Sequence, residues 1–310
     1  MSIRWTKGEI EIRRIVRNNN ALAGVVEALL LVALFAIILS IIQLQYIPII
    51  MEQKESEHMD VVENQFSNLK SVIEIQSVMG VTESSTPVAY SSMSSPITLG
   101  SKELPYFISS RSVGQVNVID IDEAGDNKIN IQPMTISEYS NGIPLTSIVY
   151  TADNAYIDDR SYILEGGGII LTQNSGTGEV GRVSPAITVQ NRSQDGYIKI
   201  YYVIPVFVVA GGKDNDAGYK DTYVRTNYSS HDTHSGVTSF INIVSEHIIG
   251  WEDFLLDNST GLLYEYYHNG YIAVSETSNS IRIEPGTKEI RVEITVVKIG
   301  VQVGAGVIFS

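Results

Sequence analysis

An apolar run near the N-terminus constrains this chain more than any other feature of its sequence. From Ala28 to Ile42 the run contains no charged side chain, and between Ala21 and Ile42 its single charge is Glu27. A helix of these 22 residues, at about 1.5 Å per residue, spans roughly 33 Å, which is enough to cross a bilayer core of about 30 Å. We therefore expect a membrane-spanning helix over residues 21–47.

The charges on either side of this run predict its orientation. Residues 1–20 carry five cationic side chains and two carboxylates, a net charge of +3. Because the whole chain has a net charge of −14, the remaining residues have a net charge of −17. Cytoplasmic flanks of membrane helices are rich in Lys and Arg, so residues 1–20 are expected to form a cytoplasmic leader and the remainder an extracytoplasmic part. So acidic an exterior disfavours nucleic acid as a partner. The absence of cysteine excludes a disulfide scaffold.

An amphipathic helix is expected to follow over residues 48–80, after a kink or interruption at Pro48. Apolar residues recur there with spacings of three and four, which is the period of one helix face. The residues of this apolar stripe are Met59, Val62, Phe66, Leu69 and Ile73. The stripe needs an apolar partner, either the domain that follows it or the same helix of a neighbouring subunit.

In residues 82–310 the helical periodicity ends, and short apolar runs are separated by Pro, Ser and Gly. We expect strands at 114–121, 127–133, 147–151, 168–173, 185–190, 196–209, 221–226, 237–244, 262–267, 271–275, 280–284 and 289–298. Gly125-Asp126-Asn127, Asn269-Gly270 and Pro285-Gly286 are the expected hairpin turns. A short helix is expected near 246–256, with Ser245 as its N-cap. The predicted fold is α+β, a long N-terminal helix followed by an antiparallel β-sandwich of about ten to twelve strands.

The N-terminal residues carry a resemblance to a known family. A basic leader, the sequence ALAGVVE and then Ala28-Leu-Leu-Leu-Val-Ala-Leu34 resemble the start of archaeal type IV pilin-like surface proteins. The amphipathic segment 57–74, LEGGGIILTQ at 164–173 and FINIVSEHIIGWEDFL at 240–255 are similar to that group as well. The resemblance implies self-association through the N-terminal helix and a leader peptidase that cleaves after Ala21 or nearby, with Asn20 and Ala21 as the candidate processing residues and a mature chain that begins close to Ala21–Gly24. In this chain Asn18 to Asn20 stand where the family commonly has Lys or Arg.

Glu27 is the one charge within the apolar run, and two roles are open for it. In bacterial pilins an early Glu neutralises the N-terminal amine of the neighbouring subunit, and the resemblance implies the same role for Glu27. A carboxylate buried without a partner costs several kcal/mol, so a partner or a protonated state would then be required. Alternatively, Glu27 lies near the cytoplasmic interface of an uncleaved anchor, where its cost is small.

Four segments contain residues that could suggest metal or phosphate chemistry, and each is better explained by local structure. His231 and His234 lie in a Ser/Thr/Gly-rich segment, expected to be a loop, without the helical HExxH pattern of zinc hydrolases. Asp120–Gly125 begins like a calcium loop but lacks the Glu at position twelve, and we interpret it as a charged hairpin tip. Asp214–Gly218 is expected to be a turn, and Gly166–Gly168 a bend or bulge. We therefore expect no metal, no cofactor and no enzymatic activity.

The sequence as a whole predicts a structural protein at the cell surface. The leading hypothesis is a subunit of an archaeal type IV pilus-like filament or related envelope assembly, with an exposed β head for adhesion. The alternative is a singly anchored surface protein that does not polymerise and binds a ligand or an envelope partner. Three sequons, at Asn191, Asn227 and Asn258, are candidate glycosylation sites of an exported chain.

Overall fold

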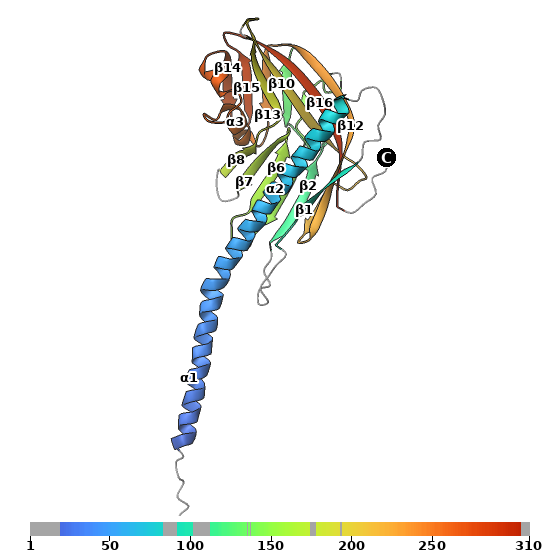
Figure 1. The fold of residues 1–310 in the computed structure, drawn as a ribbon. Helices are drawn as coiled ribbons and strands as arrows, with labels where there is room; N and C mark the ends of the chain where they lie inside the picture. Colours follow the sequence, from blue (N-terminus) through green and yellow to red (C-terminus); the bar gives the residue numbers. More distant parts are fainter. Residues whose placement is uncertain are drawn as a thin grey trace, which may run out of the picture. The chain divides into compact units, whose positions relative to one another are not determined.

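A computed structural model describes residues 19–82, 92–101, 112–134, 136, 138–173, 178–192 and 194–304. The expected leader at 1–20 therefore lies almost entirely outside the described residues. The chain divides into two compact units, Met1–Met51 and Glu52–Ser310, and each is described by itself. Figure 1 shows the order of their elements along the chain.

The first unit is helical throughout its described part. Helix α1 (Asn19–Ile41) is followed by the π-helical segment η1 (Ile42–Tyr46) and then by the start of helix α2 (Ile47–Thr82). The break expected at Pro48 is instead this π-helical segment just before it. The N–H of Ile47 donates to the carbonyl of Ile42, five residues back. Pro48 has no N–H to donate, so a local change of hydrogen-bond period precedes it and the helix continues.

All residues from 23 to 46 are exposed in this first unit. More than half of the large apolar side chains that are exposed in the described residues lie between Val25 and Ile49. One helical stretch of the described residues, Ala23–Thr82, contains a window long and apolar enough to cross a membrane. The N-terminal apolar helix can therefore anchor the protein in a membrane.

The second unit begins within α2, and its described residues contain sixteen strands in three sheets. The first sheet contains β1 (Met93–Thr98), β12 (Asp221–Thr238), β16 (Glu289–Val303), β10 (Tyr197–Val209) and β9 (Ile187–Arg192), in that spatial order. The second contains β11 (Asn215–Gly218), β2 (Val113–Ile119), β5 (Ser147–Asp153), β6 (Arg160–Glu165), β7 (Gly168–Gln173) and β8 (Gly178–Val183). The third contains β14 (Ile272–Thr277), β15 (Ser280–Pro285), β13 (Phe240–Val244), β3 (Lys128–Gln132) and β4 (Ile143–Pro144). Helices α3 (Ile248–Leu256) and α4 (Tyr264–His268) lie between β13 and β14 in the sequence.

The predicted α+β class is confirmed, because a long apolar N-terminal helix precedes a mostly β domain with several sheets. Among the strand pairs of the described residues, one departs from the antiparallel pattern. Strands β10 and β16 run parallel over thirteen residue pairs, from Tyr197 opposite Glu289 to Val209 opposite Val301. Parallel neighbours need a long crossover connection, and here everything from β11 to β15 forms it. Short-range turn signals carry no information about so distant a pairing.

Helix α2 contributes directly to one of the two hydrophobic cores. All five residues of the apolar stripe are buried, with Met59, Val62, Phe66 and Leu69 fully inaccessible and Ile73 3% exposed. They pack with side chains of the first two sheets, including Ile97, Tyr150, Leu164, Phe207 and Val297. The second core joins the other face of the first sheet to the third sheet and α3, around Trp251. Of the two partners considered for the stripe, the β domain is the one observed.

Three expected turns are not hairpins. The 262–267 segment begins a helix, α4, rather than a strand, and Asn269-Gly270 ends that helix with Gly270 at φ +68°. Asn-Gly supplies a positive φ to a helix C-terminus as readily as to a hairpin, so the dipeptide alone does not distinguish them. The turns at Gly125–Asn127 and Pro285-Gly286 connect strands of different sheets. Hairpins occur elsewhere, for example between β14 and β15.

Candidate functional site at the seam between helix α2 and the β domain

The seam is defined here as the contact of α2 residues 55–78 with the β domain. At its first turn the fully buried carboxylate of Glu55 accepts hydrogen bonds from three successive backbone N–H groups. The donors are Ala155 at 2.9 Å, Tyr156 at 2.8 Å and Ile157 at 3.0 Å, in the loop between β5 and β6. Charge-assisted hydrogen bonds are about twice as strong as neutral ones, so this contact fixes the loop to the helix.

Further along the seam, an aromatic cluster lies beside the carboxylate of Glu63. The ring of Phe66 lies between those of Tyr150 and Tyr162, with centroid distances of 6.2 Å and 6.1 Å. The hydroxyl of Tyr162 donates to the backbone carbonyl of Met59 at 3.3 Å and to the carboxylate of Glu63 at 3.2 Å. Burial and the Glu63 carboxylate raise the pKa of Tyr162, so this tyrosine stays a neutral donor.

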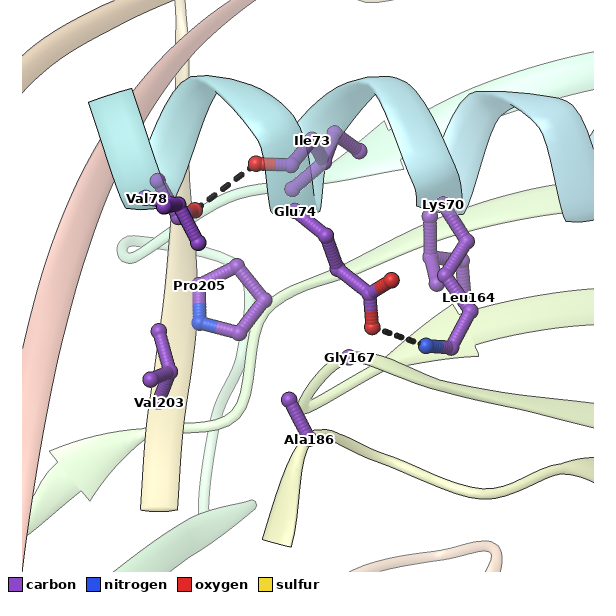
Figure 2. A pocket seen from close by; sticks show the side chains of 10 residues that line it. Lys70, Ile73, Glu74, Val78, Leu164, Gly167, Ala186, Val203 and Pro205 are labelled. Atoms are coloured by element: carbon purple, nitrogen blue, oxygen red, sulfur yellow. Dashed lines mark hydrogen bonds and ion pairs between the residues drawn. The ribbon is translucent and has the colours of Figure 1, made fainter. Parts of the chain in front are cut away.

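A pocket of about 290 Å³ opens beside the last turns of α2. Its walls are Ile73 and Val78 of the helix, Leu164 and Gly167 at the turn between β6 and β7, and Ala186, Val203 and Pro205 near β9 and β10. Figure 2 shows Lys70 and Glu74 pointing from α2 toward Gly167, joined by an ion pair. The Lys70 side chain is 8% exposed and that of Glu74 is 41% exposed. The pocket can hold an apolar group beside one neutralised pair of charges.

A buried polar cluster attaches α3 to the second sheet. Glu165, at the end of β6, is 1% exposed. Its Oε1 accepts hydrogen bonds from Ser245 Oγ at 2.6 Å and from Trp251 Nε1 at 2.8 Å. Burial raises the pKa of Glu165, although these two donors and nearby His247 act in the opposite direction.

Ser245 is not the N-cap that its position predicted. His247 occupies that place, and α3 begins at Ile248. The Ser245 hydroxyl accepts the N–H of His247 at 2.9 Å while it donates to Glu165. The prediction considered only the local helix start, whereas the Ser245 hydroxyl donates its hydrogen bond to Glu165, a residue distant in sequence.

The two residues of the expected cleavage site, Asn20 and Ala21, lie in the first turn of α1. Glu27 lies further along the same helix and is exposed. The structure thus places these three residues together on α1, and apart from the seam in sequence.

The three sequon asparagines differ in accessibility. Asn258 is exposed in the turn after α3, where the hydroxyls of Ser259 and Thr260 donate to Asp257. Asn191 is exposed on β9, and its side-chain oxygen accepts a hydrogen bond from Lys288 at 2.6 Å. Asn227 lies on β12 and is half-buried. Asn191 and Asn258 are therefore more accessible than Asn227.

Two other segments adopt strands where the sequence predicted loops or turns. His231 and His234 lie within β12 rather than in a loop. Their imidazoles have separate partners, Tyr228 Oη at 2.6 Å from His231 Nδ1 and Asp232 Oδ2 at 2.8 Å from His234 Nε2. Asp214–Gly218, expected to be a turn, contains β11. In both cases neighbouring strands supply the pairing that Ser, Thr, Asn and Asp do not favour by themselves.

The remaining two segments are turns. Asp120–Gly125 follows β2, with the Ala124 N–H donating to the carbonyl of Asp120 at 2.9 Å, but it connects two sheets and is not a hairpin tip. Gly166 and Gly167 form the expected bend, with positive φ at both positions, between β6 and β7. Within the described residues no group of three His, Cys, Asp or Glu side chains is arranged to hold a metal ion.

The polar residues of the seam were not identified from the sequence. Glu63 lies at the border of the apolar stripe, one residue after Val62. Glu55 belongs to a run of acidic residues with no periodic signal of its own. The position of Glu63 could have indicated a role at the border, whereas the backbone donors that bind Glu55 are about one hundred residues away.

No family model, curated protein or solved structure matches this chain significantly.

Proposed function

We propose that this protein is a structural subunit of an archaeal type IV pilus-like filament or related envelope assembly. In this proposal α1 lies in the membrane before assembly and in the filament core afterwards, and the β domain is an exposed head. The leader is removed near Asn20 and Ala21, so that the mature chain begins close to Ala21–Gly24. The protein has a structural and not a catalytic role.

One observation carries this proposal: the apolar stripe of α2 is covered by the chain's own β domain, whereas the apolar side chains of α1 are not covered in the described residues. The apolar stripe of α2 is already buried against its own β domain. The side chains from 23 to 46 are exposed and mostly aliphatic. An aliphatic surface of this size requires lipid or other helices around it. A filament core of packed α1 helices supplies that environment after the chain has left the membrane.

The charge distribution supports an external position for the head. The leader has a net charge of +3, and the described part beyond α1 is acidic. Under the positive-inside rule this arrangement keeps the leader in the cytoplasm. Glycosylation at the exposed Asn258 is consistent with the same location.

Glu27 distinguishes assembly from simple anchoring. Glu27→Leu removes the carboxylate that would pair with the N-terminal amine of a neighbouring subunit, so extracellular filaments should be lost while the amount of protein in membranes is kept. Ser40→Ala is the matched control, because it removes a polar group from the same helix without changing a charge. Filaments are counted by electron microscopy, and mass spectrometry identifies the first residue of the purified protein.

The results separate three outcomes. Loss of filaments for Glu27→Leu alone, with a purified chain that begins within residues 21–24, supports the proposal. Normal filaments for Glu27→Leu would refute the pairing role of Glu27. Wild-type cells without filaments, and peptides from residues 1–17 in the purified protein, would favour the singly anchored surface protein that binds an envelope partner.

A further inference from the structure

Strand β12 has a long edge that no described strand covers. On one side it pairs with β16 as far as Thr238. On its other side β1 pairs with it only from Asp221 to Thr226. Residues 229–237 therefore form a free edge nine residues long, as far as the described strands show, along which alternate residues direct their backbone N–H and C=O groups away from β16.

This edge differs from the other sheet edges in length and composition. Strands β1, β8, β9 and β14 are six residues long, and β11 and β4 are shorter. Most of them carry Pro or a charged side chain, such as Pro96 in β1, Arg182 in β8 and Glu276 in β14. Such residues discourage pairing with another chain. Residues 229–237 have the sequence SSHDTHSGV, which contains no Pro, Lys or Arg and only one carboxylate, Asp232, over a longer stretch than any of these strands.

We propose that residues 229–237 of β12 pair antiparallel with the same edge of a second copy of this chain. The two-fold axis of such a pair is normal to the sheet and passes midway between the two strands. Directly opposite residues lie on the same face, so the residue nearest the axis lies opposite its own copy. The choice of that residue sets the register.

Complementarity between the Asp232 carboxylate, a hydrogen-bond acceptor, and the His234 imidazole, a hydrogen-bond donor, selects both the second copy and the register. With Thr233 on the axis, Asp232 of each strand lies opposite His234 of the other. With Asp232 on the axis, two carboxylates would face each other, which is unfavourable. Within one copy Asp232 and His234 already contact each other at 2.8 Å, so the two strands together place two carboxylates among two imidazoles. A strand with this pattern is complementary to itself.

The proposal does not depend on filament formation, because residues 229–237 belong to the second unit and not to α1. Anchored copies and assembled copies present the same edge. Loss of filaments in Glu27→Leu and loss of β12 pairing are therefore separate results.

The natural chain contains no cysteine, which allows a clean cross-linking test. Thr233→Cys in the full chain, purified in detergent micelles, places two thiols on the axis. Directly opposite Cα atoms are about 4.5–5.5 Å apart, within the range that a disulfide bridges. Ser235→Cys is the control on the same strand, because its two copies are offset by four residues, roughly 13 Å. Thr188→Cys, exposed on β9 at the opposite edge of this sheet, is the second control.

We expect Thr233→Cys to form disulfide-linked dimers at least about tenfold faster than either control under mild oxidation, since only its thiols meet the geometric requirement. In analytical ultracentrifugation we expect the wild-type chain to be a dimer and Thr233→Lys, which places a charge on the edge, to be a monomer. Its thermal unfolding should match that of wild type, which shows that the fold is intact. Equal cross-linking of all three cysteine variants, or a monomeric wild type with no cross-linking at Thr233→Cys, would overturn the proposal.

Discussion

Arg182 of β8 holds Glu63 of α2 through two parallel contacts, from Nε to Oε1 at 2.9 Å and from Nη2 to Oε2 at 3.0 Å. The two side chains are 119 residues apart in sequence and are 42% and 25% exposed. The planar guanidinium matches the carboxylate in a way that an ammonium group cannot. This pair and the contact of Glu55 with the loop between β5 and β6 attach α2 to the second sheet at two positions along the helix.

Removal of this pair should destabilise the head modestly. We expect Arg182→Ala to lower the free energy of unfolding by about 1 kcal/mol, a value limited by the solvent around the pair. Arg291→Ala is the control, because Arg291 is paired with Glu289 of its own strand and is similarly exposed. Urea unfolding of the full chain in micelles measures both. An equal effect of the two substitutions would show that the pair across the seam has no special role.

Glu55 should matter more than its acidic neighbours. Glu55→Gln replaces one acceptor oxygen by an amide that faces backbone N–H donors, so we expect a loss of about 2 kcal/mol or more. Glu52→Gln, an exposed residue three positions earlier, should have little effect. Amide hydrogen exchange at Ala155 to Ile157 reports the loop directly. Unchanged protection there would contradict the proposed hydrogen bonds.

Phe66 tests whether the α2 stripe is a core element. Phe66→Ala removes a fully buried ring between two tyrosines, and we expect a loss of about 3–5 kcal/mol. Val61→Ala is the control on the exposed side of the helix, where Val61 is 46% exposed. If the stripe instead packed on a neighbouring subunit, Phe66→Ala would leave the unfolding of the isolated chain unchanged.

His58 should make the head less stable in mild acid. Burial lowers the pKa of His58 below its ordinary value of 6.5, although the Thr98 carbonyl and Glu55 oppose the shift. The unfolded chain then binds a proton more readily, so the contribution of His58 is present above about pH 6.5 and is lost as pH falls through the folded pKa. His58→Gln should remove this part of the pH dependence. The measurement is the difference in unfolding free energy between wild type and variant from pH 7.5 to 5.

The effect of His247 on the pH dependence of stability is opposite to that of His58. For this reason the test compares wild type with His58→Gln and does not use the pH profile of wild type alone. Burial alone would lower the pKa of His247, but the ion pair with Glu179 and the nearby Glu165 raise it. Its contribution is therefore present below about pH 6.5 and is lost as pH rises through the folded pKa. A wild type and His58→Gln variant with parallel pH profiles would contradict the role assigned to His58.

Glu165 should be tolerant of Gln and intolerant of Leu. Glu165→Leu leaves the Trp251 N–H and the Ser245 hydroxyl without an acceptor, and we expect a loss of about 2–4 kcal/mol. Glu165→Gln keeps an acceptor oxygen. The raised pKa of Glu165 means that its contribution is present below about pH 4.5 and is lost as pH rises, so Glu165→Gln should gain stability relative to wild type between pH 4.5 and 7. Tryptophan fluorescence during unfolding reports both variants.

The sequence by itself determined the elements whose signals are local. The uncharged run at 28–42 predicted α1, and spacings of three and four predicted α2 and its stripe. In β16 the alternation of Ile290, Val292, Ile294 and Val296 is the period of a strand with one apolar face, and all four are buried. In each case one period of apolar side chains is long enough to dominate the weaker preferences of single residues.

Only the tertiary structure decided what these elements contact. The parallel pairing of β10 with β16 joins segments about ninety residues apart, and the donors for Glu55 come from a distant loop. The 264–268 segment became a helix, and the segment of His231 and His234 became a strand, since neighbouring elements outweigh propensities of a few tenths of a kcal/mol. Pairing partners, the pocket at Lys70 and the free edge of β12 arise from contacts distant in sequence, which local patterns do not encode.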